Sequence, residues 1–159
     1  MRSVRGLVAV GAVAALAALG AVAFAQDALV PFAPLVPYEV VGNGIPKPLT
    51  NQPGDPVRGK TVVTDATNAT CLICHTMPDI PEQPDQGNLA PPMEHPGSKY
   101  TAAELRLRLV NPKVLNPDTI MPAYYRLEGL TRVQQQYVGK TVYKPQDIED
   151  VIAYLLTLK

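Results

Sequence analysis

Apolar residues recur at helical spacing near the C-terminus. Pro145 is a favourable first residue for a helix, and Asp147 and Glu149 follow near the positive end of the helix dipole. Four apolar residues then fall at i, i+3, i+4 and i+7, and so share one face: Ile148, Val151, Ile152 and Leu155. This pattern predicts an amphipathic helix that begins at Pro145 and runs to the C-terminus.

A second helix is indicated by a start signal upstream. Residues 101–104 read Thr-Ala-Ala-Glu, which is a capping box. The helix that it opens carries Leu105 and Leu109 on one face. Asn111 followed by Pro112 predicts its end, because the residue before a proline is driven out of the helical conformation.

Asp55 followed by Pro56 predicts a third helix, with a capping side chain and a proline at the first helical position. Residues 61–64 are β-branched and favour helix poorly, so only tertiary packing would hold it. Gly59 is expected to allow close approach of the last helix, with Tyr154 or Leu155 packed against it, or else to be merely a weak point. Three short helices, much loop and no strand pattern predict an all-α fold.

The first 25 residues have the pattern of a signal peptide. Arg2 and Arg5 precede an uncharged apolar run from Leu7 to about Ala23, and 23–25 read Ala-Phe-Ala, small residues where a signal peptidase cuts. The alternative is a retained anchor, but the run is shorter than the roughly 20 residues that span a bilayer. We expect cleavage after Ala25, export to the periplasm and no membrane span in the mature chain.

Residues 26–53 are interrupted by prolines and predict an extended, partly polyproline arm. Its apolar residues favour a strap that lies on a surface, either of this chain or of a partner. The predicted organisation is a signal peptide over 1–25, a proline-rich extension over 26–53 and a helical domain over 54–159.

Charge and cysteine content exclude several classes of function. The 159-residue chain balances 14 basic with 14 acidic residues, and loss of the signal peptide would leave a net charge of −2. A nucleic-acid-binding protein usually has a net basic surface, so we expect no nucleic acid as a partner of this chain. Two cysteines are too few for a multi-disulfide scaffold.

Both cysteines lie in one motif, Cys71-Leu72-Ile73-Cys74-His75, the C-x-x-C-H pattern of covalent haem c attachment. Two thiols three positions apart can reach the two vinyl groups of one macrocycle, which leaves the imidazole of His75 beneath the iron. A thioredoxin-like site would need a βαβ pattern, and a structural zinc would need more ligands than His95 can add. The motif predicts one covalently bound haem c.

The sixth iron position requires a second donor. Met77 is too close to His75 to reach the opposite face of the ring, which leaves Met121, with His95 or Met93 as alternatives. Pro122 biases Met121 to an extended backbone, so a loop can present its sulfur to the iron. We therefore predict His75 and Met121 as axial ligands, a pair that raises the reduction potential and suits electron transfer.

Other residues are expected around the haem. The second ring nitrogen of His75 needs a partner, and the carbonyl of Pro91 is the candidate acceptor. Tyr124, Tyr125 and Arg126 follow the predicted methionine loop and are candidates for the haem edge or its propionates, although solvated surface suits Arg126 nearly as well.

Several tracts beyond the haem motif are shared with a known family. They span residues 54–159: Gly54-Asp55-Pro56, Tyr100-Thr101-Ala102-Ala103-Glu104-Leu105-Arg106, Asn111-Pro112-Lys113, Met121-Pro122-Ala123-Tyr124-Tyr125-Arg126, Ile148-Glu149-Asp150-Val151-Ile152-Ala153-Tyr154-Leu155 and Thr157-Leu158-Lys159. Through them the chain resembles SoxX, the monohaem c-type cytochrome subunit of the sulfur-oxidising SoxXA complex.

The resemblance implies a small cytochrome c-like fold and a heterodimer with a SoxA-like cytochrome subunit. The implied activity is that of an L-cysteine S-thiosulfotransferase, which oxidatively joins thiosulfate to a cysteine of a SoxYZ-like carrier. SoxA would supply the reactive cysteine, because haem would occupy both thiols here. This subunit would accept the electrons and pass them to a small cytochrome c.

Two other functions are compatible with the motif. A free periplasmic electron carrier would be a monomer that docks through weak electrostatics, which a charge of −2 supports poorly. A ligand-binding or peroxidatic haem would have an open sixth position, with Met121 unbound.

Overall fold

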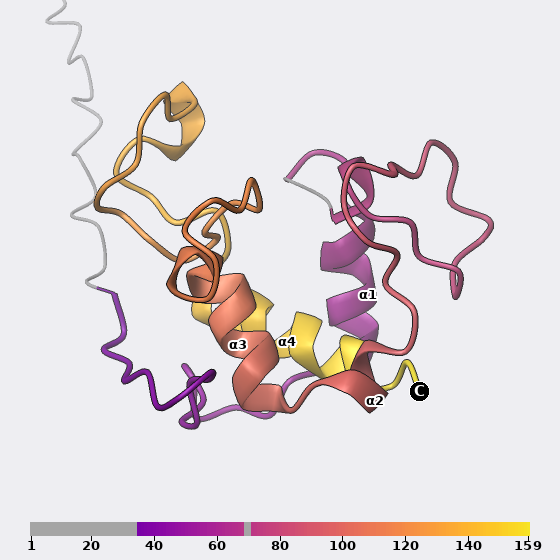
Figure 1. The fold of residues 1–159 in the computed structure, drawn as a ribbon, viewed down its shortest axis with the longest axis horizontal. Helices are drawn as coiled ribbons and strands as arrows, with labels where there is room; N and C mark the ends of the chain where they lie inside the picture. Colours follow the sequence, from indigo (N-terminus) through magenta and orange to yellow (C-terminus); the bar gives the residue numbers. More distant parts are fainter. Residues whose placement is uncertain (1–34, 69–70) are drawn as a thin grey trace, which may run out of the picture. The chain divides into compact units, whose positions relative to one another are not determined.

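The computed structural model describes residues 35–68 and 71–159, so the predicted signal peptide and the start of the extension lie outside the described residues. Within these residues, four α-helices and three 3₁₀ turns follow one another (Figure 1): α1 (Pro56–Thr64), η1 (Cys71–Ile73), α2 (Pro96–Lys99), α3 (Ala102–Val110), η2 (Pro112–Val114), η3 (Gln135–Tyr137) and α4 (Pro145–Leu155). The only β pairing in the described part is a bridge between Val41 and Gly44. The prediction of an all-α fold is confirmed.

Helix α1 begins as its sequence predicts. The Asp55 side chain accepts hydrogen bonds from the backbone N–H groups of Val57 and Arg58, and Pro56 occupies the first turn. The β-branched second half is held by packing against α4, with Val63 fully buried. Tertiary contact therefore compensates for a poor helix former.

The contact between α1 and α4 depends on glycine. A Cβ atom built on Gly59 would lie 1.9 Å from the Asp150 carbonyl oxygen and 2.9 Å from the Tyr154 Cβ atom. No side chain fits in that space. The predicted close approach is confirmed, with Tyr154 rather than Leu155 against the glycine.

Helices α3 and α4 both begin with a side-chain cap. Thr101 and Glu104 form the predicted capping box: the Thr101 hydroxyl accepts from the Glu104 N–H, and the Glu104 carboxylate accepts from the Thr101 N–H. At α4 the residue before the helix is Lys144, whose N–H donates to the Asp147 carboxylate at 2.9 Å. Half of a capping box is enough to start this helix, because its apolar face is buried.

A buried ion pair joins α3 and α4 and fixes part of the extension. Arg106 and Glu149 form two parallel hydrogen bonds of 2.7 Å, and their side chains are 4% and 6% exposed. Arg106 also donates to the Ile45 carbonyl, while Glu149 accepts from the Leu49 N–H at 2.8 Å. Ile45 and Leu49 are buried as well, so this part of the arm is a strap on the chain's own helices.

Among the described residues, no helix is long and apolar enough to cross a membrane.

Candidate haem site

The cysteine motif forms a tight turn after α1. The N–H groups of Cys74 and His75 both donate to the Cys71 carbonyl, at 3.2 and 3.0 Å. Cys71 and Leu72 are buried, whereas Ile73 is exposed and Cys74 is partly exposed. The turn brings Cys71 and His75, four positions apart, to the same cavity.

A second loop, residues 86–93, is fastened to this turn by backbone hydrogen bonds. The N–H groups of Gly87, Ala90 and Met93 donate to the carbonyls of Leu72, Cys74 and Thr76 at 2.7–2.9 Å. Gly87 is required at its position, because a Cβ atom there would lie 2.1 Å from the Ile73 carbonyl oxygen. The loop is thereby held in register with the motif.

This register positions the histidine ring. The Nδ1 atom of His75 lies 2.7 Å from the Pro91 carbonyl oxygen, as the sequence predicts. A carbonyl only accepts hydrogen bonds, so Nδ1 carries a proton, and in the neutral imidazole Nε2 then has the lone pair. The ring is therefore oriented with one nitrogen free to bind a metal.

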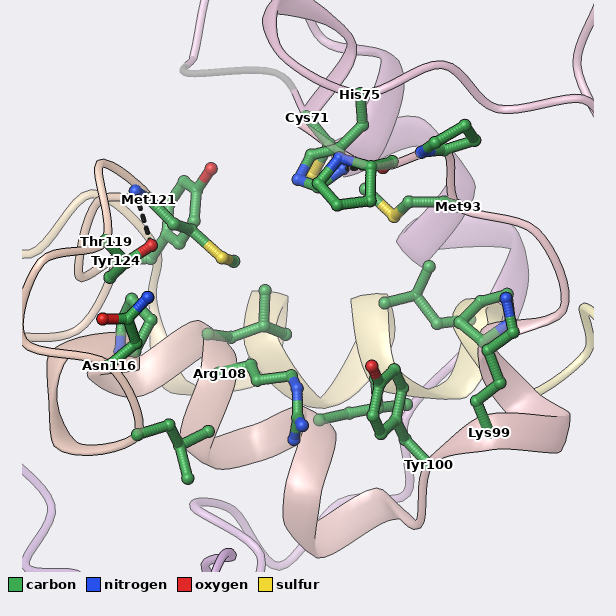
Figure 2. Close-up of a pocket in the computed structure, with 18 of the residues that line it drawn as sticks. Cys71, His75, Met93, Lys99, Tyr100, Arg108, Asn116, Thr119, Met121 and Tyr124 are labelled. Atoms are coloured by element: carbon green, nitrogen blue, oxygen red, sulfur yellow. Dashed lines mark hydrogen bonds between the residues drawn. The ribbon is translucent and has the colours of Figure 1, made fainter. Parts of the chain in front are cut away.

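The His75 side chain lines a cavity of about 420 Å³, within the range typical of small-molecule sites. Its walls come from three parts of the chain: residues 71–75, residues 91–109, and residues 112–124, with Leu155 contributed by α4. Figure 2 shows the Cys71 and His75 side chains together on one side of this space.

Of the four candidates for the second iron ligand, only Met93 and Met121 line the cavity. Met77 is fully buried in the core, and His95 forms a hydrogen bond with the Lys159 carbonyl; neither lines the cavity. Met93 does line it, but its backbone is bonded to Thr76, next to His75. Met121 reaches the cavity from the other wall, and Figure 2 shows its thioether directed inward.

The loop before Met121 is shaped by short polar contacts. The Met121 N–H donates to the Thr119 hydroxyl at 3.2 Å, and the Lys113 ammonium donates to the Thr119 carbonyl at 2.7 Å. Tyr124 is anchored through its N–H to the Leu109 carbonyl. These contacts orient the loop without any helical constraint on Met121.

Of the three residues expected near the haem edge, only Tyr124 lines the cavity. Its ring stacks on Tyr143, with centroids 4.5 Å apart. Tyr125 is buried elsewhere, where its hydroxyl accepts from the Val36 N–H, and Arg126 lines a different hollow with Leu35. The chain turns away from the cavity after Tyr124, which explains why its two neighbours do not reach it.

Sequence reasoning missed three polar side chains that line the cavity: Lys99, Tyr100 and Arg108. One signal was available, because Arg108 lies three residues after Leu105 and next to Leu109. It therefore lies on the apolar face of α3, where a cation is unusual.

The buried groups near the motif are held in their neutral forms. Burial raises the pKa of the Cys71 thiol to about 11, although hydrogen bonding with Tyr143 works in the opposite direction. Burial likewise raises the pKa of Tyr124 and of Tyr143. At neutral pH Cys71 is a thiol rather than a thiolate, and so a poor nucleophile.

Comparison with known proteins identifies the family. The family model for cytochrome c matches residues 56–159. Among solved structures, the chain is similar to a chain of the crystal structure of SoxXA from P. pantotrophus, with 34% sequence identity and a TM-score of 0.69 over 77% of this chain and 94% of that chain. No curated protein matches. The chain belongs to the cytochrome c family, which implies covalently bound haem c, and is a SoxX-like cytochrome.

Proposed function

We propose that this protein is the electron-accepting, single-haem subunit of a thiosulfate-oxidising complex of the SoxXA type. The observation that carries the proposal is the similarity to a SoxXA chain, because it extends over 94% of that chain at 34% identity. A match confined to the haem motif would have supported only a c-type cytochrome.

Within this proposal, Cys71 and Cys74 hold the haem through thioether bonds, and His75 and Met121 bind the iron. The donor set fits haem c: the free Nε2 of His75 is available to the cavity, and the Met121 thioether enters from another wall. The bound haem would supply reversible one-electron transfer, and histidine–methionine ligation suits a relatively high potential.

The sulfur chemistry is assigned to a partner. The complex would join thiosulfate to a carrier cysteine, forming a sulfur–sulfur bond and releasing two electrons and the thiol proton. Neither cysteine of this chain suits the role of nucleophile, since both would be bound to haem and the Cys71 thiol is buried. A SoxA-like subunit would provide the reactive cysteine, a SoxYZ-like protein the carrier, and a small cytochrome c the electron outlet.

Location in the periplasm is part of the same proposal. The basic residues Arg2 and Arg5, the apolar run and the Ala-Phe-Ala sequence at 23–25 support export with cleavage after Ala25. Attachment of haem to cysteines normally takes place outside the cytoplasm, which agrees with this location.

Affinity purification tests the assignment. The tagged, haem-loaded protein would be isolated from the periplasmic fraction of its native host, and co-purifying subunits identified by mass spectrometry. We expect one stoichiometric partner with its own haem and a cysteine outside any haem motif. Recovery of a lone low-spin cytochrome, even at low salt, would contradict the proposal and indicate a free electron carrier.

A further inference from the structure

The cavity contains two cations that the proposed ligand set does not use. Lys99, at the end of α2, and Arg108, on α3, both line it, together with Tyr100. Figure 2 shows Arg108 and Tyr100 on the opposite side of the space from Cys71 and His75. Neither cation forms an ion pair within residues 35–68 and 71–159.

Arg108 is held in place but keeps free donors. Its guanidinium lies over the Tyr100 ring, 4.0 Å from the centroid, and one nitrogen donates to the Glu104 carbonyl at 3.0 Å. A guanidinium has five N–H groups, so most of them remain available to an anion in the cavity. Held in this way, the group loses less conformational entropy when an anion binds.

The anion that fits follows from the structure of haem, so this inference rests on the proposed function. Haem carries its two vinyl groups on one half of the macrocycle and its two propionates on the other. Thioethers to residues 71 and 74 would fix the vinyl half at the cysteine motif. The propionates would then point away from it, towards the wall with Lys99 and Arg108.

We propose that Arg108 and Lys99 bind the two haem propionates, with Tyr100 as a positioning residue for Arg108. Two carboxylates beside a mostly apolar cavity need compensating charge, and charge-assisted hydrogen bonds from cations provide it. Arginine can bind one carboxylate through two parallel hydrogen bonds, whereas lysine interacts with the other as a point charge.

The arrangement has a consequence for the reduction potential. Besides the two cations, the ionisable groups that line the cavity are Glu94, His75, Tyr100, Tyr124 and Cys71. Glu104, one turn before Arg108 on α3, also interacts with that guanidinium, but its carboxylate is hydrogen-bonded to Thr101. Neither Glu94 nor Glu104 forms an ion pair with Lys99 or Arg108 in the described residues, so both cations remain available to the propionates. The two cations keep the propionates in their ionised form and balance their negative charge. The reduction potential of the haem should therefore change little with pH near neutrality. An uncompensated propionate would favour ferric iron and would lower the potential.

The test uses the full-length, haem-loaded protein and its variants Arg108→Gln and Lys99→Met. Lys47→Met serves as a charge-matched control, because Lys47 is exposed and does not line the cavity. Midpoint potentials would be measured by spectroelectrochemistry from mildly acidic to neutral pH, together with the propionate modes in the resonance Raman spectrum. Lys99 is exposed, so its variant remains informative if Arg108→Gln folds poorly.

We expect Arg108→Gln to lower the potential most, Lys99→Met to lower it less, and both to make it rise as the pH falls. Lys47→Met should behave like the wild type. Wild-type potentials and Raman modes in both variants would overturn this inference while leaving haem attachment and the proposed function intact. A changed potential in only one of the two variants would overturn the proposal that Arg108 and Lys99 each bind a propionate. A wild-type chain without covalent haem would instead contradict the proposed function.

Discussion

In the helical scaffold, the decisive contacts join residues from distant parts of the sequence, whereas the cavity wall that carries His75 is built from neighbouring loops. Arg106 meets Glu149, and Gly59 meets the backbone of Asp150. Residues 86–93, in contrast, are bonded to residues 72–76, which lie 15 to 17 positions upstream. The difference suggests that stability and iron ligation can be changed separately in this chain.

The largest effect on stability should come from the buried ion pair. Glu149→Gln would leave the Arg106 charge buried without a counter-ion, and we expect a loss of about 3–5 kcal/mol in the free energy of unfolding. Chemical denaturation of the haem-loaded protein measures it. The exposed pair of Lys60 and Glu82 is the control, since Glu82→Gln should cost within about 1 kcal/mol. Equal losses in both variants would contradict the account.

A smaller loss is expected at the contact between α1 and α4. Gly59→Ala would place a Cβ atom against the Asp150 carbonyl, and relief of this overlap should cost about 1–3 kcal/mol or more. Val57→Ala, on the exposed side of the same helix, should change stability little. In both variants the spectrum of the folded haem should stay that of the wild type. An altered axial-ligand spectrum in Gly59→Ala would contradict the claim that stability and iron ligation can be changed separately.

A substitution in the cavity should have the opposite effect, with an altered haem spectrum and an unaltered helical fold. Met121→Ala should abolish the long-wavelength sulfur-to-iron band of the ferric protein, because Met121 is the only methionine that the described part of the chain places on that wall. Its helical circular dichroism should be unchanged, since α1, α3 and α4 do not depend on the methionine. Met93→Ala is the matched control and should keep the band. Loss of the band in Met93→Ala, with retention in Met121→Ala, would reverse the assignment of the ligand.

The smallest effect concerns a helix cap at acid pH. Hydrogen bonds from the N–H and hydroxyl of Thr101 lower the pKa of Glu104 in the folded state. Its carboxylate therefore stabilises the fold above the unfolded-state pKa of about 4.3, and this contribution disappears as the pH falls through the folded-state value.

Glu104→Gln should therefore be slightly less stable than the wild type at neutral pH, and the difference should vanish in acid. Denaturant midpoints measured at a series of pH values test this, with Glu39→Gln on the exposed arm as the control. A difference that persists at low pH would show that the charge of Glu104 does not act through the cap.

Local patterns predicted much of the fold and one contact of the candidate site, that of His75 with Pro91. The capping box at Thr101 and the helix start at Asp55 each depend on a few neighbouring positions, and both are confirmed. The contact between His75 and Pro91 could also be predicted, because the two segments are close in sequence. Such features need no knowledge of the tertiary arrangement.

Apart from the approach of α4 to Gly59, contacts between distant residues could not be predicted in this way. Nothing near Arg106 in the sequence indicates that Glu149 is its partner, and the strap at Ile45 depends on the same pair. Arg126 looked suitable for the haem edge because it follows Met121 closely, but the chain turns away after Tyr124. The two cavity cations instead come from α2 and α3, which only the folded chain brings to the site.

Rapid-kinetic absorption of the haem tests the central claim most directly. The purified complex with its SoxA-like partner would be mixed with thiosulfate and the SoxYZ-like carrier, and the spectrum of this chain's haem recorded over time. The account predicts that ferric haem becomes ferrous only when thiosulfate and a carrier with a free cysteine are both present. Haem that stays ferric during thiosulfate conjugation would contradict the proposed role as electron acceptor.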